Sequence, residues 1–184
     1  MKRQIRNSVF ETNSSSMHSL VIKKSGGYYT DKELHEDLWL HNGKWDIWNN
    51  EKITFGRHPF RCLGTFESKV RYAIASLCAW KEDKVEKFEE IEALVTEIIP
   101  DCWSIELPKV SWGWDDDDDD AKISYGYVDV DILTPFLKNE NISLKEFLTN
   151  KRYAVIVDGD EYCIWDDLKN SGLVNVDEIE KECH

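Results

Sequence analysis

The sequence predicts a single α+β domain in which antiparallel β-hairpins pack with two central amphipathic helices. Short runs of β-branched and apolar residues, separated by turns that contain Gly, Asn or Asp, favour hairpins. In the middle of the chain, apolar residues recur at the spacing of an α-helix. The 184 residues suffice to bury one core, and no linker or internal repeat divides them. We therefore expect residues 1–184 to form one domain.

The first predicted hairpin occupies residues 3–24. Its strands are residues 3–11 and 17–24, and its tip is residues 12–16. The second strand contains a Leu-Val-Ile run, and a Ser-Gly-Gly sequence follows it, which ends the hairpin.

Capping residues and apolar stripes predict the helices. Residues 30–41 favour a short helix, with Thr30 as its N-cap and Glu33 completing a capping box. Residues 142–148 favour another, with Ser143 as N-cap. Two central helices are predicted from stripes that we expect to be buried: Val70, Ile74, Leu77 and Cys78 in the first, and Val85, Phe88, Ile91, Leu94, Val95 and Ile98 in the second, which Pro100 ends.

Two further hairpins are predicted in the second half of the chain. They pair residues 105–112 with 122–130, and residues 153–157 with 161–165. An acidic loop, residues 115–120, lies at the tip of the first, and Asp158-Gly159 supplies a strong turn signal for the second. A short strand at residues 53–55 and a terminal helix at residues 176–183 complete the expected elements.

Charge and composition argue against several classes of protein. The net charge of −13 disfavours a general, salt-driven nucleic-acid binder, which normally has a basic footprint. No run approaches the roughly 18 apolar residues of a membrane span, and the N-terminus lacks the apolar segment of a signal peptide, so we expect a cytoplasmic protein. The five cysteines form no C-x-x-C pair and H-E-x-x-H is absent, so we expect neither a cofactor nor a metal.

Residues 10–20 hold the densest group of chemically active side chains. These are Glu11, Asn13, Ser14, Ser15, Ser16, His18 and Ser19. A turn needs little besides Gly, Asn or Asp. This segment adds a carboxylate and an imidazole, the side chain whose unperturbed pKa lies near neutrality. Residue types alone leave two interpretations open, a polar turn and a reaction site.

As a reaction site, the segment suits cleavage of RNA without a metal. That reaction needs a base for the 2′-hydroxyl, an acid for the leaving oxygen and donors for the charge on phosphate. His18 can serve as base or acid and Glu11 as its complement. The other candidates act on phosphate: Ser14, Ser15 and Ser16 as catalytic donors, and Asn13, Ser19, Arg3, Arg6 and Arg57 as substrate-binding residues.

Two further groups admit both a functional and a structural interpretation. Arg57, His58 and Arg61 form a small basic island that either grips phosphate or belongs to a surface loop. Three tryptophans, Trp39, Trp45 and Trp48, either stack on bases or pack in the core, and their aromatic area favours the core.

Two acidic groups are weaker candidates. The aspartates at residues 115–120 favour a solvated tip over a partner-facing surface, and they lack the ligand pattern of a calcium loop. Asp129 and Asp131 share one face of an extended segment, which is compatible with a metal site or with an ordinary exposed strand.

Residues 6–19 read Arg-Asn-Ser-Val-Phe-Glu-Thr-Asn-Ser-Ser-Ser-Met-His-Ser, which resembles the opening of a group of small proteins from phages and mobile elements of Gram-positive bacteria. Residues 53–60, 125–131 and 153–162 fit the same group loosely. The group is similar to anti-CRISPR proteins directed at the type II effector nuclease, and one branch is associated with truncation of the guide RNA. The resemblance implies an active site beside a β-hairpin, at Glu11, Asn13, Ser14, Ser15, Ser16, His18 and Ser19.

This resemblance raises RNA cleavage above the other options and names its partners. It implies an anti-CRISPR ribonuclease that shortens guide RNA while docked on the effector nuclease, whose basic surface would bring an acidic protein to RNA. The alternative is a non-catalytic acidic protein that mimics nucleic acid and blocks DNA or guide binding. Catalysis requires Glu11 and His18 on one face of the hairpin, because a one-residue slip in register separates them.

Overall fold

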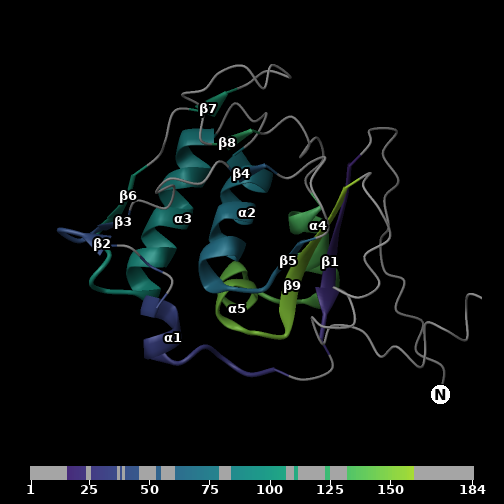
Figure 1. The fold of residues 1–184 in the computed structure, drawn as a ribbon, viewed down its shortest axis with the longest axis horizontal. Helices are drawn as coiled ribbons and strands as arrows, with labels where there is room; N and C mark the ends of the chain where they lie inside the picture. Colours follow the sequence, from purple (N-terminus) through teal and green to yellow (C-terminus); the bar gives the residue numbers. More distant parts are fainter. Residues whose placement is uncertain are drawn as a thin grey trace, which may run out of the picture.

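The structure, a computed structural model, contains helices and a small antiparallel sheet and confirms the predicted α+β class (Figure 1). It describes residues 16–23, 26–36, 38, 40–45, 53–54, 61–78, 84–106, 110–111, 123–124 and 132–159. Within these ranges, no helix is long and apolar enough to cross a membrane.

The main sheet has three strands in the order β1-β9-β5. They are β1 (Ser16–Ile22), β9 (Tyr153–Gly159) and β5 (Arg61–Leu63). β9 lies in the middle and runs antiparallel to both neighbours. It begins with Tyr-Ala-Val-Ile-Val, an apolar and β-branched run that suits a central strand.

Two long helices pack side by side next to this sheet. α2 (Phe66–Cys78) contacts both β9 and α3 (Lys84–Ile98), so it lies between α3 and the sheet (Figure 1). The Ser68 N–H donates to the Thr65 hydroxyl at 3.2 Å, which caps the start of α2. α3 ends before Pro100, as predicted, because proline has no N–H to continue the helix.

The predicted stripes of these helices face the core. In α2, Val70, Ile74, Leu77 and Cys78 are buried. In α3, Ile91 and Val95 are buried, while Phe88, Leu94 and Ile98 pack against the core with partial exposure. Both stripes are therefore confirmed for these residues, and the side chain of Val85 lies outside the described set.

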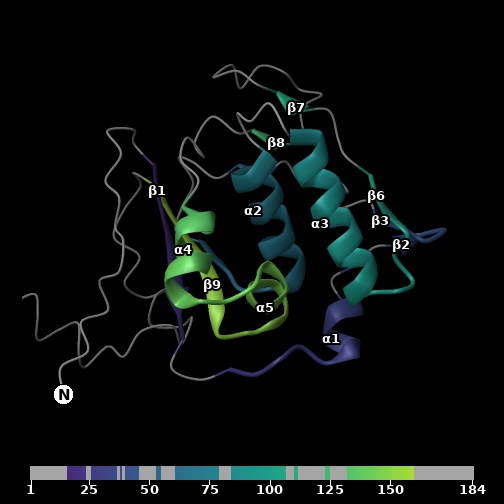
Figure 2. The same ribbon diagram turned by 180° about the vertical axis from the view of Figure 1, so that it is seen from behind.

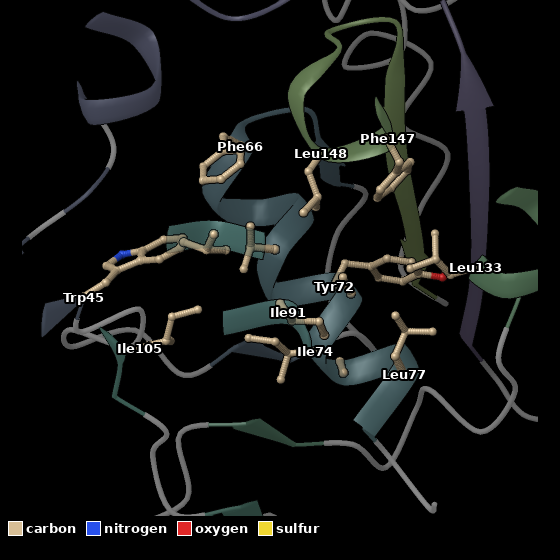
Figure 3. Close-up of a cluster of buried hydrophobic side chains, with 14 of the residues drawn as sticks. Trp45, Phe66, Tyr72, Ile74, Leu77, Ile91, Ile105, Leu133, Phe147 and Leu148 are labelled. Atoms are coloured by element: carbon tan, nitrogen blue, oxygen red, sulfur yellow. The ribbon is translucent and has the colours of Figure 1, made fainter. Parts of the chain in front are cut away.

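Aromatic side chains line the two ends of the core (Figure 3). Trp45 is fully buried and stacks on Phe66, with ring centroids 6.1 Å apart. The interpretation of Trp45 as a core residue is thus confirmed, while Trp39 and Trp48 lie outside the described residues. At the other end, Phe147 lies 6.3 Å from Tyr153 at the start of β9.

Two short helices carry the predicted caps. α1 (Asp31–Glu36) begins after Thr30, whose N–H donates to Glu33 Oε2 at 2.9 Å while the Glu33 N–H donates to Thr30 Oγ1 at 3.4 Å. The capping box is confirmed, although the helix is shorter than the predicted range. α5 (Leu144–Thr149) begins after Ser143, whose hydroxyl accepts from the Glu146 N–H at 3.0 Å, also as predicted.

One helix, α4 (Leu133–Glu140), was not predicted from the sequence. Pro135 lies in its first turn, where a missing N–H costs no helical hydrogen bond. Asn141 ends it in the left-handed conformation, with φ 53°, as asparagine often does at a helix C-terminus.

Among the residues that the structure describes, six two-residue strands form two small sheets. One has the order β2-β3-β6, with β2 and β3 joined by an Asn42-Gly43 turn in which both residues have positive φ. The other has the order β4-β8-β7. The strands are β2 (Leu40–His41), β3 (Lys44–Trp45), β6 (Ser104–Ile105), β4 (Ile53–Thr54), β8 (Ile123–Ser124) and β7 (Val110–Ser111).

The predicted hairpin of residues 105–112 with 122–130 is wrong in its direction of pairing. β7 and β8 pair in parallel, with Val110 opposite Ile123, whereas a hairpin requires antiparallel strands. The acidic loop at residues 115–120 lies outside the described residues. β4 also pairs in parallel with β8, so this sheet is assembled from separate parts of the chain rather than from one hairpin.

The predicted hairpin around Asp158-Gly159 is also wrong. β9 continues through both residues, which pair with Met17 and Ser16 of β1. β1 and β5 occupy the two edges of residues 155–157, so a hairpin with residues 161–165 cannot form there. Long-range pairing therefore overrides the local turn signal. Of the first predicted hairpin, the second strand is present as β1, while residues 3–11 and the predicted helix at 176–183 lie outside the described residues.

Candidate functional site

The core-facing side of the main sheet is built from rows of paired residues. Residues directly opposite each other share a face, and faces alternate along each strand. Leu20, Val155 and Leu63 form one row across the three strands, and all three pack in or against the core. The adjacent pair, Ile22 and Tyr153, does the same. These two rows define the core-facing side.

The next row on this side contains two candidate residues from the sequence. His18 on β1 and Arg61 on β5 are both paired with Val157 of β9. Because neighbouring strands lie about 4.8 Å apart, positions 18 and 61 are roughly 10 Å apart across the sheet. In the row beyond them, Ser16 is paired with Gly159. We call these five positions the sheet-end site.

The sequence of β1 explains this arrangement. The strand reads Ser-Met-His-Ser-Leu-Val-Ile, so its polar residues come first and its apolar residues last. The apolar half pairs with residues 153–155 of β9, which are buried, and the polar half pairs with residues 156–159. The same register that fixes the core thus fixes the position of His18.

Ser19 occupies the opposite face of the sheet. It is paired with Ile156, which is paired in turn with Cys62 of β5. Strand alternation therefore groups Ser16 with His18 and separates Ser19 from both. Of the predicted site residues in β1, only Ser16 and His18 share a face.

The other predicted site residues lie outside the described part of the chain. They are Glu11, Ser14 and Ser15 among the catalytic candidates, and Asn13, Arg3, Arg6 and Arg57 among the substrate-binding candidates. The condition that Glu11 and His18 share a face stays a prediction. Asp129 and Asp131, the alternative metal ligands, lie outside as well.

A second polar cluster, not predicted from the sequence, surrounds a buried lysine. Lys69 on α2 has 0% exposure, and its ammonium donates to the carbonyl oxygens of Phe147 and Asn150 at 2.9 Å each. These carbonyls belong to the C-terminal end of α5, where the helix dipole favours a cation. The ring of Tyr29 lies 4.7 Å from the ammonium, close enough for a cation–π interaction.

The surroundings of Lys69 change its protonation. Burial, with a smaller contribution from the nearby charge of Lys23, lowers the pKa of Lys69 to about 7, and Glu146 opposes the shift. The sequence does carry a signal for this site, because Lys69 lies among apolar positions of α2, between Phe66 and Val70. A charged residue at a core-facing helical position needs an internal partner.

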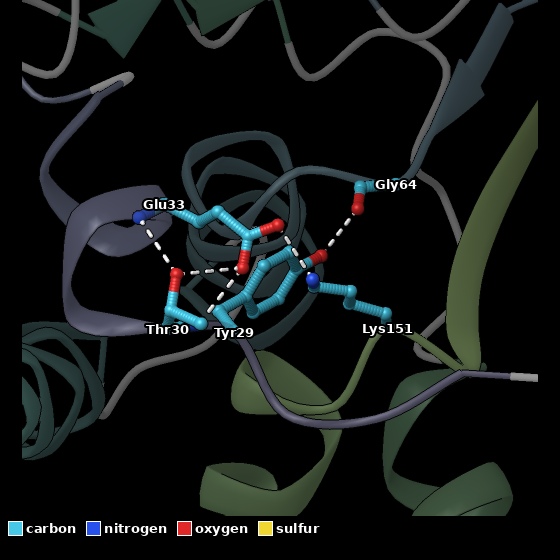
Figure 4. Close-up of polar contacts among 5 residues, drawn as sticks. All are labelled: Tyr29, Thr30, Glu33, Gly64 and Lys151. Atoms are coloured by element: carbon cyan, nitrogen blue, oxygen red, sulfur yellow. Dashed lines mark hydrogen bonds and ion pairs between the residues drawn. The ribbon is translucent and has the colours of Figure 1, made fainter.

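Tyr29 also lies beside a neighbouring ion pair, between Lys151 and Glu33 (Figure 4). The Tyr29 hydroxyl donates to the carbonyl of Gly64, and its ring lies 5.5 Å from the Lys151 ammonium. Lys151 also pairs with Glu33 of the α1 capping box, with 2.5 Å between Nζ and Oε1. The hydrogen bond from Lys151, followed by those from Thr30, lowers the pKa of Glu33 to about 2.

We call Lys69, Tyr29, Lys151 and Glu33 the lysine cluster; it holds the connection between α5 and β9. That connection is short, and Figure 2 shows α5 leading directly into β9. Lys69 binds the carbonyls of Phe147 in α5 and of Asn150 at the start of the connection, and Lys151 is the next residue. Lys69 therefore ties α2 to the C-terminal end of α5, just before β9 begins.

Neither a metal centre nor a known relative indicates the activity. Among the residues that the structure describes, no group of three or more His, Cys, Asp or Glu is arranged to hold a metal ion. Cys78 and Cys102 are buried, and neither forms a disulfide within the part of the chain that the structure describes. No protein-family model, curated protein or solved structure matches the chain.

Proposed function

We propose that this chain is an anti-CRISPR protein that inhibits a type II effector nuclease by cleaving its guide RNA, without a metal, in the cytoplasm of a bacterial host. The observation that supports it most is that His18 and Arg61 are paired with the same residue of β9 and so lie in one row of the sheet. This row pairs a proton-transfer group with a fixed cation. The resemblance of residues 6–19 to phage and mobile-element proteins supplies the partner.

The reaction consists of one phosphoryl transfer within the RNA. A base removes the proton of a ribose 2′-hydroxyl, and the oxygen attacks the adjacent phosphorus. The 5′-oxygen leaves with a proton from an acid, so the products carry a 2′,3′-cyclic phosphate and a 5′-hydroxyl. His18 performs one proton transfer and Glu11 the other, while Ser14, Ser15 and Ser16 donate hydrogen bonds to the phosphate.

Docking on the effector brings the acidic chain to RNA. With a net charge of −13, the free protein repels nucleic acid, and its association with RNA needs basic surface from a partner. Cleavage is therefore expected only when the guide is loaded on the effector nuclease.

A denaturing gel of labelled guide RNA, incubated with effector and inhibitor, tests this proposal. The wild-type chain should shorten the guide, and His18→Ala should slow the reaction by about 100-fold or more, because a general acid or base contributes about 10²- to 10⁴-fold. His41→Ala is the matched control, since His41 is an exposed histidine on β2, outside the main sheet. Equal cleavage by the two variants would refute the role of His18, and inhibition by EDTA would refute the metal-free reaction.

One observation favours the alternative, a non-catalytic mimic of nucleic acid. α3 exposes carboxylates at helical spacing, at Glu86, Glu89, Glu90 and Glu97. Such a face, added to the overall negative charge, can occupy a basic nucleic-acid channel of the effector. In the same assay the mimic would leave the guide intact and abolish DNA binding, and replacing Glu86, Glu89 and Glu90 by Gln would restore that binding.

A further inference from the structure

We infer that the indole of Trp103, together with the carboxylates of α3 and Asp101, forms a docking surface for a basic protein surface that presents arginine. This inference goes beyond the proposed function, because a partner can bind here with or without cleavage of RNA. Naming the effector nuclease as that partner rests on the proposed function. The inference is carried by the position of Trp103, which is 69% exposed, and by the charge of the neighbouring segment of the chain.

The backbone and a glycine hold Trp103 in a defined place. The Trp103 N–H donates to the Gly43 carbonyl at 2.9 Å, which extends the parallel pairing of β3 with β6 by one residue. Gly43 has φ 75°, and a Cβ at this position would overlap with the indole, so the ring lies directly against the glycine. The ring is therefore positioned before any partner binds, and little conformational freedom is lost on binding.

β6 returns along α3, which brings Trp103 beside this helix (Figures 1 and 2). The Cys102 N–H donates to the Ile99 carbonyl at 2.9 Å, just after α3 ends. The Ile105 N–H donates to Glu92 Oε1 at 2.7 Å, near the middle of the helix. Trp103 lies between these two contacts in the sequence, so it is located beside the C-terminal half of α3.

The exposed charge of this part of the chain is negative. Within residues 86–103, every charged side chain that is exposed is a carboxylate: Glu86, Glu89, Glu90, Glu97 and Asp101. The four glutamates share one face of α3, because they are three, four or seven residues apart. Lys87 pairs with Glu90 at 2.8 Å, and Lys145 pairs with Glu97 at 2.7 Å. Ion pairs at the surface contribute little to stability, so a cation of a partner can replace these lysines.

Two basic residues near Gly43 belong to the other face of the small sheet. Lys44 is paired with Ser104, and His41 is paired with Lys44, so these three residues share a face. Trp103 directly precedes Ser104, and strand alternation assigns it to the opposite face. The charge on the side of the indole is therefore set by the carboxylates.

This charge selects one class of partner. Carboxylates repel RNA, DNA and anionic lipid, and a second copy of this chain brings the same net charge of −13. A basic protein surface is attracted instead. Arginine suits the site best, because its guanidinium can stack on an indole and can donate two hydrogen bonds to a carboxylate. Tryptophan is also among the residues that contribute most to binding at protein interfaces.

Fluorine NMR of the full chain labelled with fluorotryptophan tests the surface directly. The signal that is lost in Trp103→Phe belongs to Trp103, and the unchanged signals of the other tryptophans show that the variant is folded. An oligoarginine peptide should shift the Trp103 signal, and an oligolysine peptide of equal length should require a higher concentration. Asp101→Asn should raise the half-maximal concentration of oligoarginine by about threefold, the effect of one exposed ion pair.

Truncation of effector-bound guide tests the same surface on the proposed partner. Trp103→Ala should raise the half-maximal concentration of inhibitor by about 30-fold, as expected for a tryptophan at the centre of an interface, and should leave the rate at saturation unchanged. Tyr28→Ala is the matched control, because Tyr28 is an exposed aromatic residue that is bridged to Asn150 rather than to the small sheet. This variant should behave as the wild type.

Failure of the docking surface and failure of the proposed function are distinguishable. If oligoarginine shifts the Trp103 signal but the wild type leaves the guide intact, the proposed function fails and the docking surface stands. If oligoarginine leaves the signal unchanged, or if only single-stranded RNA shifts it, the inference is overturned, whatever happens to the guide. Equal half-maximal concentrations for Trp103→Ala and Tyr28→Ala in the truncation assay would overturn it as well.

Discussion

The sheet-end site and the lysine cluster both contain basic residues, and they lie at opposite ends of β9. His18 and Arg61 occupy the row of the core-facing side next to Leu20, Val155 and Leu63. Lys69 lies within the core itself, with 0% exposure, and its ammonium is bound to two backbone carbonyls. The two regions share β9, which starts at the lysine cluster and ends at the sheet-end site.

The comparison distinguishes polar residues that stabilise the fold from polar residues that serve a function. A buried charge whose donors are taken up by the protein stabilises one conformation, and its removal should change folding. The row of positions 18 and 61 is proposed to act on the substrate, so replacing its residues should change activity. The predictions below test this distinction.

The largest effect on stability is expected for Phe147→Ala. Phe147 is fully buried, packs against Phe136 and Tyr153, and supplies one of the carbonyls that bind Lys69. Removing the ring leaves a cavity and should lower the free energy of unfolding by about 3–5 kcal/mol. Urea denaturation measures the change. The control is Tyr28→Ala, because Tyr28 is 62% exposed; it should cost at most about 1 kcal/mol. Similar losses for the two variants would contradict the assignment of this end of the core.

A smaller effect, with a distinctive pH dependence, is expected for Lys69→Met. The pKa of Lys69 is about 7 in the folded protein and 10.5 for an ordinary lysine. Between these values the unfolded chain binds more protons, so the stability contributed by Lys69 rises with pH and is lost as pH falls through about 7. Lys69→Met has no titrating group at this position and therefore lacks this pH-dependent contribution to stability.

The difference in unfolding free energy between wild type and Lys69→Met should therefore change by up to about 2 kcal/mol from about pH 7 to about pH 8.5, since one proton gives at most about 1.4 kcal/mol per pH unit. Denaturation at the two pH values measures it. Lys145→Met, at an exposed lysine on α5, should show no such change. A constant difference between wild type and Lys69→Met would mean that the buried amine does not titrate in this range.

The smallest effect is expected for Thr30→Ala, at the edge of the lysine cluster. The change removes the hydroxyl that accepts from the Glu33 N–H and should cost about 1 kcal/mol, the usual value for an N-cap. Thermal unfolding followed by circular dichroism measures it, and Ser143→Ala at the cap of α5 should give a loss of similar size. Guide truncation should be unchanged at a temperature where both variants are folded. A loss of activity by Thr30→Ala alone would show that the two regions are coupled.

Features encoded within one helix could be predicted from the sequence. The α2 and α3 stripes and the caps at Thr30 and Ser143 depend on residues three or four positions apart, and the structure confirms them. α4 was missed because Pro135 lies inside it, although proline in a first turn is compatible with a helix.

Features that depend on distant pairing could not be predicted. Asp158-Gly159 has the composition of a turn, yet β1 draws both residues into β9. For the candidate site, the sequence indicated His18 and Ser16 by residue type, and it offered Arg61 only as one member of a basic island. Their common face follows from the register between β1, β9 and β5, which no local pattern encodes. Lys69 was missed because the two carbonyls that accept from it are far along the chain.

The central place of β9 has a consequence for synthesis on the ribosome. β1 and β5 leave the ribosome before β9 does. In the main sheet they do not pair with each other, and both pair with β9, which is encoded much later. Sheets closed by such distant contacts form slowly, because a long loop must be ordered before any pairing stabilises it. A nascent chain truncated before Tyr153 would contain His18 and Arg61 without the strand that aligns them, so any cleavage of guide RNA would begin only after β9 has been translated.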